Sequence, residues 1–263
     1  MRTNEILKAL PLLVGGALVV AMSGACDQPR TACVTGRGDF AAKYNLVSGT
    51  GACAALKGEV IGVQSYNANA GDHPDLEKSS MAIRPSSLGE LVVRGEGDGL
   101  VDPNTEHKPF SYGPFTTSEP GDDNFCAAPT LSVTEQNLPV LPAIPADPKD
   151  PESTETPEQP ATSRKYEWSN VHVYVTAAAT GTQFAADLTY TEDGCSAKYH
   201  VLAVYPAATC KGKDGKPEIK LCGAEADLSV GMETGSGLSP DFAITCDPEL
   251  FLCVLSKEPP SLR

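Results

Sequence analysis

The cysteines are the residues of this chain whose chemistry is easiest to interpret, and there are nine of them among 263 residues. In an oxidising compartment cysteines pair as disulfides, and an odd number leaves one without a partner. A zinc cluster needs closely spaced pairs such as Cys-x-x-Cys or alternating cysteine and histidine, and the sequence contains neither pattern. The cysteines therefore favour disulfides over metal binding, with one thiol left for another purpose.

The beginning of the chain has the order of a secretory signal peptide. Charged residues Arg2 and Lys8 precede an apolar run from Ala9 to Met22. This run is shorter than the roughly 20 apolar residues that a helix needs to cross a bilayer. Small residues follow it, and Cys26 comes directly after them.

This arrangement resembles the lipobox of bacterial lipoproteins, although Ser23 stands where lipoboxes usually have Leu, Val or Ile. The resemblance implies cleavage between Ala25 and Cys26, a lipid on the Cys26 thiol, and acyl chains that anchor the new amino terminus in a membrane. It also implies a location in the cell envelope, on the outer or inner membrane, facing the periplasm or the cell surface. The alternative is an ordinary secreted protein in which Cys26 joins a disulfide.

With Cys26 set aside for lipid, an even set of cysteines remains, which predicts four disulfides. The candidates are Cys33, Cys53, Cys126, Cys195, Cys210, Cys222, Cys246 and Cys253. The sequence does not determine how they pair. Short loops favour Cys210–Cys222 and Cys246–Cys253, and they leave the other four cysteines to pair among themselves.

The last two cysteines frame a motif in which Cys-Asp-Pro is followed by four residues and Cys-Val, over residues 246–254. The motif is similar to short cysteine turns in uncharacterised, cysteine-rich lipoproteins of myxobacteria. This resemblance covers few residues, so it implies a source and leaves the activity open.

Carboxylates offer a weaker candidate site. Asp98, Asp102, Asn104 and Glu106 place four oxygen-bearing side chains close together in sequence, a density that suits calcium. Their spacing is not that of an EF-hand loop, and a solvated acidic turn is the simpler interpretation. We therefore expect no metal site.

Other motifs give no catalytic constellation. His172 and His200 fall on predicted strands of one sheet, but zinc would need a third ligand. The sequence has no Gly-x-Ser-x-Gly motif, phosphate-binding loop or dinucleotide fingerprint. We expect no cofactor, and we interpret the tripeptide at residues 37–39 (Arg-Gly-Asp) as a turn.

The charge balance argues against nucleic acid as a partner. The chain has 20 Lys and Arg against 34 Asp and Glu, a formal net charge of -14. It has no basic stripe that could release counterions from a polyanion such as DNA.

The elements that must position these residues are predicted to be mostly strands. Valines alternate with polar or aromatic residues over 168–177, and residues 184–191 alternate similarly up to an Asp193-Gly194 turn. Residues 197–205 are apolar on both faces, which indicates a central strand. Three such strands joined by tight turns predict an antiparallel meander.

The first half of the chain is less regular. Residues 59–66 and 80–84 are predicted strands, and Ser87 with Glu90 forms a capping-box pattern for a short helix into 91–93. Together the segments predict a mainly β fold, a disulfide-stapled antiparallel β-sandwich whose sheet takes strands from both sides of a proline-rich inserted loop.

That inserted loop lies between Pro139 and Pro160, where seven prolines share one register of three among five acidic residues. Such spacing suits a polyproline II rod, which at about 3.1 Å per residue would be roughly 70 Å long and could serve as a spacer or docking ribbon. A solvated loop is the simpler interpretation. The predicted organisation is a signal peptide (1–25), an N-terminal part of the β domain (26–128), the linker or loop (129–163), and a C-terminal meander with cysteine hairpins (164–263).

These observations predict a membrane-anchored lipoprotein whose folded part is not an enzyme. We expect it to bind a protein or glycan of the envelope or to serve as a structural module, because no acid, base and nucleophile come together in the sequence. The alternative is an extracellular hydrolase whose carboxylates converge in space, for example Asp187 and Glu192.

Overall fold

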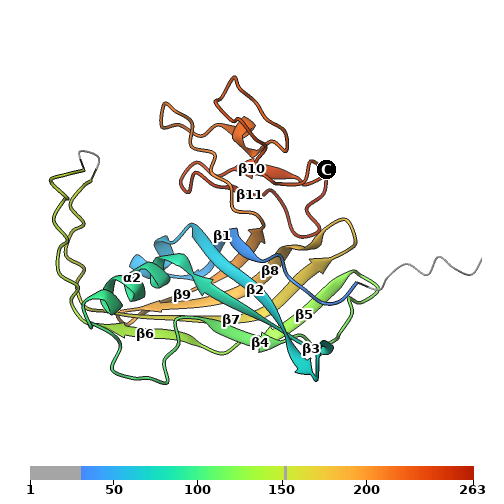
Figure 1. Cartoon of the computed structure of the whole chain (residues 1–263), viewed down its shortest axis with the longest axis horizontal. Helices are drawn as coiled ribbons and strands as arrows, with labels where there is room; N and C mark the ends of the chain where they lie inside the picture. Colours follow the sequence, from blue (N-terminus) through green and yellow to red (C-terminus); the bar gives the residue numbers. More distant parts are fainter. Residues whose placement is uncertain (1–30, 151–152) are drawn as a thin grey trace, which may run out of the picture. The chain divides into compact units, whose positions relative to one another are not determined.

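Strands dominate the computed structural model, which describes residues 31–150 and 153–263 (Figure 1). The predicted signal peptide and Cys26 lie outside the described residues. In the described ranges no helix is long and apolar enough to cross a bilayer. The elements, two of them (η2 and η3) 3-10 helices, are β1 (Gly38–Gly49), η2 (Ala52–Ala55), β2 (Gly58–Ala70), β3 (His73–Pro85), α2 (Ser86–Gly97), β4 (Ser111–Pro114), β5 (Phe125–Thr130), β6 (Thr134–Leu138), β7 (Thr162–Val175), β8 (Thr180–Glu192), β9 (Cys195–Val204), η3 (Ile219–Cys222), β10 (Ile244–Cys246) and β11 (Cys253–Leu255).

Nine strands of the described chain form one antiparallel sheet in the order β4-β3-β2-β1-β9-β8-β7-β5, with β6 also paired to β7. The two ends of the sheet approach each other, because Thr116 N donates to Ala127 O and Ser132 N to Tyr112 O, both at 2.8 Å. The sheet therefore curls until its halves face each other like the layers of a sandwich. The prediction of a mainly β, disulfide-stapled antiparallel fold is confirmed, with both layers taken from one sheet.

The meander β7-β8-β9 follows the predicted alternation. Its second turn consists of Asp193 and Gly194, both with positive φ (47° and 89°), which matches the twist of two-residue hairpins. β9 lies between β8 and β1, so the third strand of the meander is central as predicted.

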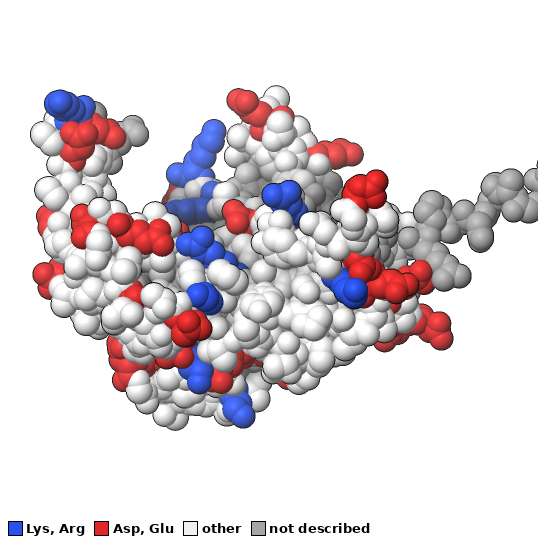
Figure 2. All heavy atoms as spheres, turned by 60° about the horizontal axis from the view of Figure 1, so that its bottom comes forward, with Lys and Arg blue, Asp and Glu red and all other residues white. Residues whose placement is uncertain are grey.

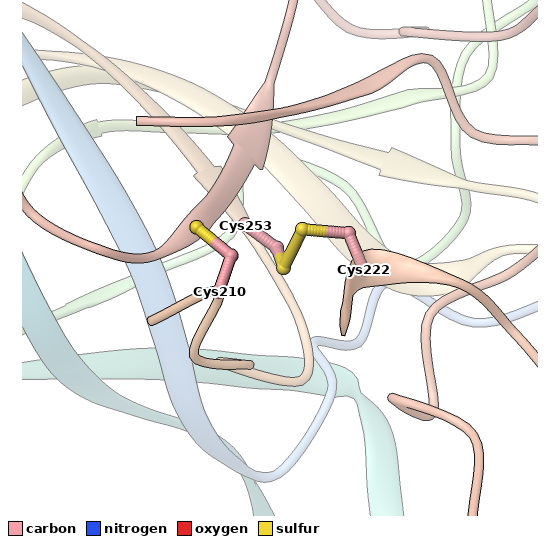
Figure 3. Close-up of side chains that lie close together, drawn as sticks. All are labelled: Cys210, Cys222 and Cys253. Atoms are coloured by element: carbon pink, nitrogen blue, oxygen red, sulfur yellow. A yellow bond between two sulfur atoms is a disulfide. The ribbon is translucent and has the colours of Figure 1, made fainter. Parts of the chain in front are cut away.

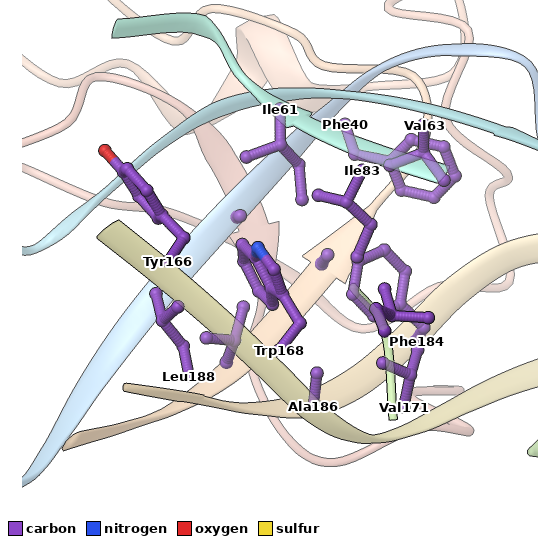
Figure 4. Packing of buried hydrophobic residues seen from close by; sticks show 14 of the residues in the cluster. Phe40, Ile61, Val63, Ile83, Tyr166, Trp168, Val171, Phe184, Ala186 and Leu188 are labelled. Atoms are coloured by element: carbon purple, nitrogen blue, oxygen red, sulfur yellow. The ribbon is translucent and has the colours of Figure 1, made fainter. Parts of the chain in front are cut away.

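The interior of the curled sheet holds the main hydrophobic core (Figure 4). Side chains from β1, β2 and β3, including Phe40, Ile61 and Ile83, face side chains from β7 and β8, including Trp168 and Phe184. All five are at most 1% exposed. Burial of a large apolar side chain contributes about 1.5–3 kcal/mol, so this core is the main source of stability for the sheet.

The helix α2 packs against β2, β3 and β6 and buries Leu88 and Val92 in the core. The predicted capping box is wrong, because Ser87 does not bond to Glu90. Its N–H and Oγ donate instead to Glu59 Oε2 on β2, at 3.0 and 2.7 Å. A free N–H group in the first turn of the helix thus donates to a carboxylate from β2. A contact of this kind leaves no signature in the local sequence.

Residues 206–263, here called the C-terminal lobe, pack on the outer face of β1 and β9 (Figure 1). Ala41 and Val204 on that face share a second, smaller core with Phe242 and Val254 of the lobe. The lobe has little regular structure besides η3 and the two three-residue strands β10 and β11.

Four disulfides join the described cysteines: Cys33–Cys126, Cys53–Cys195, Cys210–Cys246 and Cys222–Cys253. The predicted short-loop pairs Cys210–Cys222 and Cys246–Cys253 are wrong, although both cysteines of each pair do lie in the lobe. The sulfur atoms of Cys210, Cys222 and Cys253 lie within 4.8 Å of one another (Figure 3). Because several sulfurs meet at one place, the direction of each side chain decides the pairing, and loop length does not.

The proline-rich segment doubles back on itself, so the extended rod of roughly 70 Å is wrong. Isolated bridges join Leu141 to Gln159 and Ile144 to Thr156 in antiparallel fashion. The Arg94 guanidinium of α2 donates to carbonyl oxygens on both arms of this hairpin, those of Leu141, Pro142 and Pro157. The hairpin is therefore held at its base by the last turn of α2.

Candidate functional site

A groove crosses the outer face of β2, β3 and β4 beside the start of β1, and we call it the β2–β4 groove. Its volume is about 880 Å³, compared with about 590, 610 and 340 Å³ for three other surface hollows. Alternate residues of a strand point to the same face of a sheet, so the floor is formed by every second residue of each strand.

Strand pairing arranges the groove residues in rows. Asp39 on β1 pairs with Gly62 on β2, which pairs with Arg84 on β3. In the next row Ala82 on β3 pairs with Tyr112 on β4. Directly paired side chains lie only about 4.5–5.5 Å apart, so glycine and alanine in the middle leave an open floor between the larger residues.

The tripeptide Arg37-Gly38-Asp39 forms part of this site, and its interpretation as a turn is wrong. Gly38 and Asp39 are the first residues of β1, where Gly38 pairs with Val63. Arg37 and Asp39 are exposed and line the groove.

Aromatic side chains stand along the groove. Tyr66, Phe110 and Tyr112 are 52%, 38% and 56% exposed, and the rings of Phe110 and Tyr112 lie 6.5 Å apart. In the described part of the chain these three are the only exposed large aromatic residues, since the others are buried or partly buried. Exposed aromatic residues are thus confined to one place on the surface.

Cations also gather in the β2–β4 groove, although the chain as a whole is acidic. Figure 2 shows a face of the molecule on which Asp and Glu outnumber Lys and Arg. The groove reverses that balance, with Arg37, Lys78 and Arg84 against Asp39. Lys78 pairs with Asp75 at 3.2 Å, whereas Arg37 and Arg84 form no ion pair within the described residues.

A second polar cluster surrounds His107. Its Nδ1 lies 2.8 Å from Asp102 Oδ2, and its Nε2 lies 3.5 Å from Glu135 Oε1. Asp102 also accepts hydrogen bonds from the backbone N–H groups of Asn104 and Asn137. Burial by itself raises the pKa of Asp102, but these donors and His107 outweigh it and lower the pKa.

This cluster does not form the calcium site that we considered from the sequence. Each oxygen of Asp102 accepts a backbone N–H, and His107 lies against Oδ2, so this carboxylate already has donors on both oxygens. Asp98 and Glu106 do not join Asp102 in a metal site. Among the described His, Cys, Asp and Glu residues, none of these three belongs to a group with three ligand atoms within 4.8 Å of one another. The cluster instead ties the loop after α2 to β6.

A third polar cluster lies on the outer face of the meander. His200 on β9 contacts Asp187 on β8 at 3.3 Å and Glu258 of the C-terminal lobe at 2.8 Å. Asn170 donates to Asp187, and this bond together with His200 and His172 lowers the pKa of Asp187. The two histidines therefore share one face with a carboxylate between them, and the cluster links the sheet to the lobe.

The two carboxylates suggested for a hydrolase do not converge. Asp187 and Glu192 lie five positions apart on β8, so their side chains point to opposite faces, roughly 16 Å apart along the strand. Glu192 forms an ion pair with Arg164 at 2.7 Å, away from Asp187.

The described metal-ligating groups offer no free site either. Only Cys210, Cys222 and Cys253 bring three ligand atoms together in the described chain, and all three are in disulfides. No free thiolate therefore remains at that cluster to bind a metal ion.

An interior carboxylate that the sequence analysis did not single out is Glu59. Its Oε1 accepts hydrogen bonds from the hydroxyls of Tyr44 (3.1 Å) and Tyr166 (3.3 Å), while Oε2 accepts one from the Ser87 hydroxyl. Burial raises the pKa of Glu59 despite these donors. Because none of the four hollows reaches it, we assign Glu59 to holding α2 in place.

Sequence reasoning also missed the β2–β4 groove. The predicted strands 59–66 and 80–84 include half of its floor, and their alternation marks Gln64 and Tyr66 as outward-facing. The missing information is that β4, a four-residue strand, pairs beside β3 and adds Tyr112.

Comparison with known proteins places the chain in a family. Residues 38–206, which cover the curled sheet from β1 to β9, match the MlpA family. A relative named "Putative lipoprotein MlpA" from Myxococcus xanthus is 28% identical over 256 residues, which cover 94% of this chain and 92% of the relative. No solved structure shows significant similarity to the chain. The expected resemblance to myxobacterial lipoproteins is confirmed, and the chain belongs to the MlpA family.

Proposed function

We propose that this protein is a lipid-anchored component of the bacterial cell envelope that binds a saccharide in the β2–β4 groove and catalyses no reaction. The observation that carries the proposal is the confinement of the exposed aromatic residues, Tyr66, Phe110 and Tyr112, to this groove. Ligand sites combine apolar rings with a few convergent polar groups, and the groove adds Gln64 and Ser80 to its rings.

A saccharide suits this combination of groups. The faces of aromatic rings carry negative partial charge and attract the C–H groups on the apolar face of a sugar ring. Amide and hydroxyl side chains such as Gln64 and Ser80 can both donate to and accept from sugar hydroxyls. Tyr and Phe lose little side-chain freedom on binding, which favours them at binding surfaces.

The anchor is supported by the lipobox resemblance at Cys26 and by the name of the Myxococcus xanthus relative, which describes a lipoprotein. Two or more acyl chains hold a protein stably on a membrane, whereas one chain gives only marginal binding. A non-enzymatic role is supported by the separation of Asp187 and Glu192 on opposite faces of β8.

The anchor is tested by the intact mass of the full-length protein purified from its native membrane. We expect an amino terminus at Cys26 that carries two or three acyl chains. The variant Cys26→Ala should remain unacylated and partition with the soluble fraction. An unmodified amino terminus on the wild-type protein would reject the anchor.

The binding site is tested with the double variant Tyr66→Ala/Tyr112→Ala against a panel of neutral and charged oligosaccharides. Stacking on an aromatic side chain is worth about 1–3 kcal/mol per ring in other ligand systems, so we expect at least a roughly ten-fold loss of affinity. Leu228→Ala is the control, since Leu228 is 78% exposed and does not line the groove. Equal losses in both variants, or a panel in which nothing binds, would reject the saccharide site.

A further inference from the structure

We infer that the saccharide held by the β2–β4 groove is anionic, a sugar chain that carries carboxylate or phosphate groups, and that Arg37 and Arg84 bind those groups. This inference rests on the proposed function and names the class of ligand for the same site. It follows from the charge, the shape and the strand pairing of the groove.

The charge of the groove is opposite to that of the chain. The formal net charge is -14, so a polyanion is repelled from most of the surface. In the groove three cations stand against one acid. Within the described residues Arg37 and Arg84 are engaged in no ion pair, and Arg84 Nη2 donates to the Gly89 carbonyl oxygen of α2 at 3.3 Å. Arginine presents a planar fork of N–H donors that fits carboxylate or phosphate oxygens two at a time.

The strand pairing leaves the space between the arginines open. Gly62 lies between Asp39 and Arg84 in one row, and Arg37 lies two residues before Asp39. A Cβ built on Gly62 would meet nothing nearer than the Arg84 carbonyl oxygen at 3.8 Å. An acidic group of the ligand above Gly62 would therefore have Arg84 on its β3 side and, beyond Asp39, Arg37 on its β1 side.

The shape of the groove suits a chain molecule more than a single sugar. A second hollow of about 610 Å³ shares Asp39, Gly62 and Arg84 with the groove and continues to the exposed side of α2. Glu90 and Arg94 of α2 line that continuation, and Arg94 also donates to carbonyl oxygens of the proline-rich hairpin. The binding surface thus extends on both sides of Arg84, with the aromatic residues on one side and α2 on the other.

An acidic peptide fits this surface less well. Extended peptides gain affinity by adding a strand to an open sheet edge. In the groove floor β1 covers the edge of β2 as far as Val63, and β4 covers the edge of β3 over Ser80–Ile83. At these positions no strand can be added, so recognition there comes from side chains, and rings with amides and hydroxyls match a sugar.

The experiment measures the affinity of the full-length protein for an oligogalacturonate and for the same oligomer with every carboxyl group methyl-esterified. The two probes differ only in charge. We expect the acidic form to bind at least about ten-fold more tightly, because hydrogen bonds to charged groups exceed neutral ones. The preference should fall as salt concentration rises.

Three variants locate the effect. Arg37→Gln/Arg84→Gln should lower the affinity for the acidic form to that for the ester and leave the ester unchanged. Gly62→Leu keeps every charge and ring but fills the floor, so it should weaken both forms about ten-fold or more. The pair Lys149→Gln/Lys198→Gln removes two exposed charges elsewhere and should preserve the preference.

The outcomes separate the two claims. Equal affinity for both probes, or loss of the preference in the Lys149 and Lys198 control, overturns the inference and leaves the proposed saccharide site standing. A poly-glutamate peptide that binds as tightly as the oligogalacturonate also overturns the inference, since charge alone would then suffice. If neither probe binds and the tyrosine double variant changes nothing in the oligosaccharide panel, both claims fall.

Discussion

The curled sheet and the C-terminal lobe of this protein are held together by different means. The sheet encloses a continuous core of buried aromatic and aliphatic side chains and forms hydrogen-bond ladders along long strands. The lobe has two paired strands of three residues each and a small core that it shares with the outer face of β1 and β9. Hydrophobic burial therefore maintains the sheet, whereas covalent links must maintain the lobe.

The disulfides fit this division. Cys33–Cys126 and Cys53–Cys195 join residues 93 and 142 positions apart and reinforce a sheet that is already paired. Cys210–Cys246 and Cys222–Cys253 join residues 36 and 31 positions apart inside the lobe. The lobe thus has two covalent links within fewer than 60 residues and little regular structure besides them.

The largest effect is expected from removal of both lobe disulfides. A native disulfide typically contributes about 2–4 kcal/mol, so replacement of Cys210, Cys246, Cys222 and Cys253 by Ala should unfold the lobe locally. Hydrogen exchange should show loss of protection in residues 206–263, with β7 to β9 still protected.

The matched control removes one sheet disulfide with Cys33→Ala/Cys126→Ala. This variant should keep the lobe protected and lower the global free energy of unfolding. If β7 to β9 lose protection together with the lobe in the first variant, the two regions unfold as one unit and the comparison is wrong.

The next largest effect is expected from a substitution in the core of the sheet. Trp168 is 1% exposed in the centre of the core, and Trp168→Ala should lower the free energy of unfolding by about 3–5 kcal/mol. Chemical denaturation followed by circular dichroism measures this loss. Val93→Ala, at a position 59% exposed on α2, should change stability by less than about 0.5 kcal/mol. A loss below 1 kcal/mol for Trp168→Ala would contradict a sheet maintained by its core.

The smallest effect is a difference in pH dependence between two carboxylates. Burial raises the pKa of Glu59 in the sheet above 4.5. Burial alone would also raise the pKa of Asp247 in the lobe, but the N–H groups of Leu250 and Glu249 and the Lys43 ammonium lower it below 3.8. Ionised Glu59 therefore costs stability as pH rises through its raised pKa, whereas Asp247 contributes stability that is lost as pH falls through its lowered pKa.

Two variants test these signs by denaturation as a function of pH. Glu59→Gln should flatten the loss of stability that the wild-type sheet shows as pH rises above 4.5. Asp247→Asn should flatten the loss of lobe protection as pH falls below 3.8 and should weaken the lobe at neutral pH, because Lys43 loses its partner at 3.2 Å. A Glu59→Gln variant that still loses stability above pH 4.5 like the wild type, or an Asp247→Asn variant that still loses lobe protection below pH 3.8, would contradict the assignment.

The meander could be predicted from the sequence because the patterns that specify it lie within neighbouring residues. Alternation over residues 168–177 and 184–191 and the Asp193-Gly194 turn lie within one stretch of chain, and the turn residues fit the positive φ angles found there. The cysteine hairpin predicted near the end of the chain is formed by β10 and β11, but the Cys246–Cys253 disulfide predicted to close it is not.

The pairing of cysteines and the candidate site could not be predicted, because they depend on contacts between distant segments. The Cys210 sulfur lies within 4.8 Å of the sulfurs of Cys222 and Cys253, and only the path of the lobe selects Cys246 as its partner. Glu59 and Ser87 meet because β2 and α2 pack together. The groove needs Arg37, Gly62 and Tyr112 from three separate segments, and no local pattern in these segments shows that they come together.

The position of β1 in the sheet affects when the fold can form. β1 lies between β2, which follows it closely in the chain, and β9, which begins at Cys195. A chain that emerges amino terminus first therefore exposes one unpaired edge of β1 until more than half of its length has followed. Such late pairing makes folding slow, since the most distant contacts must close last.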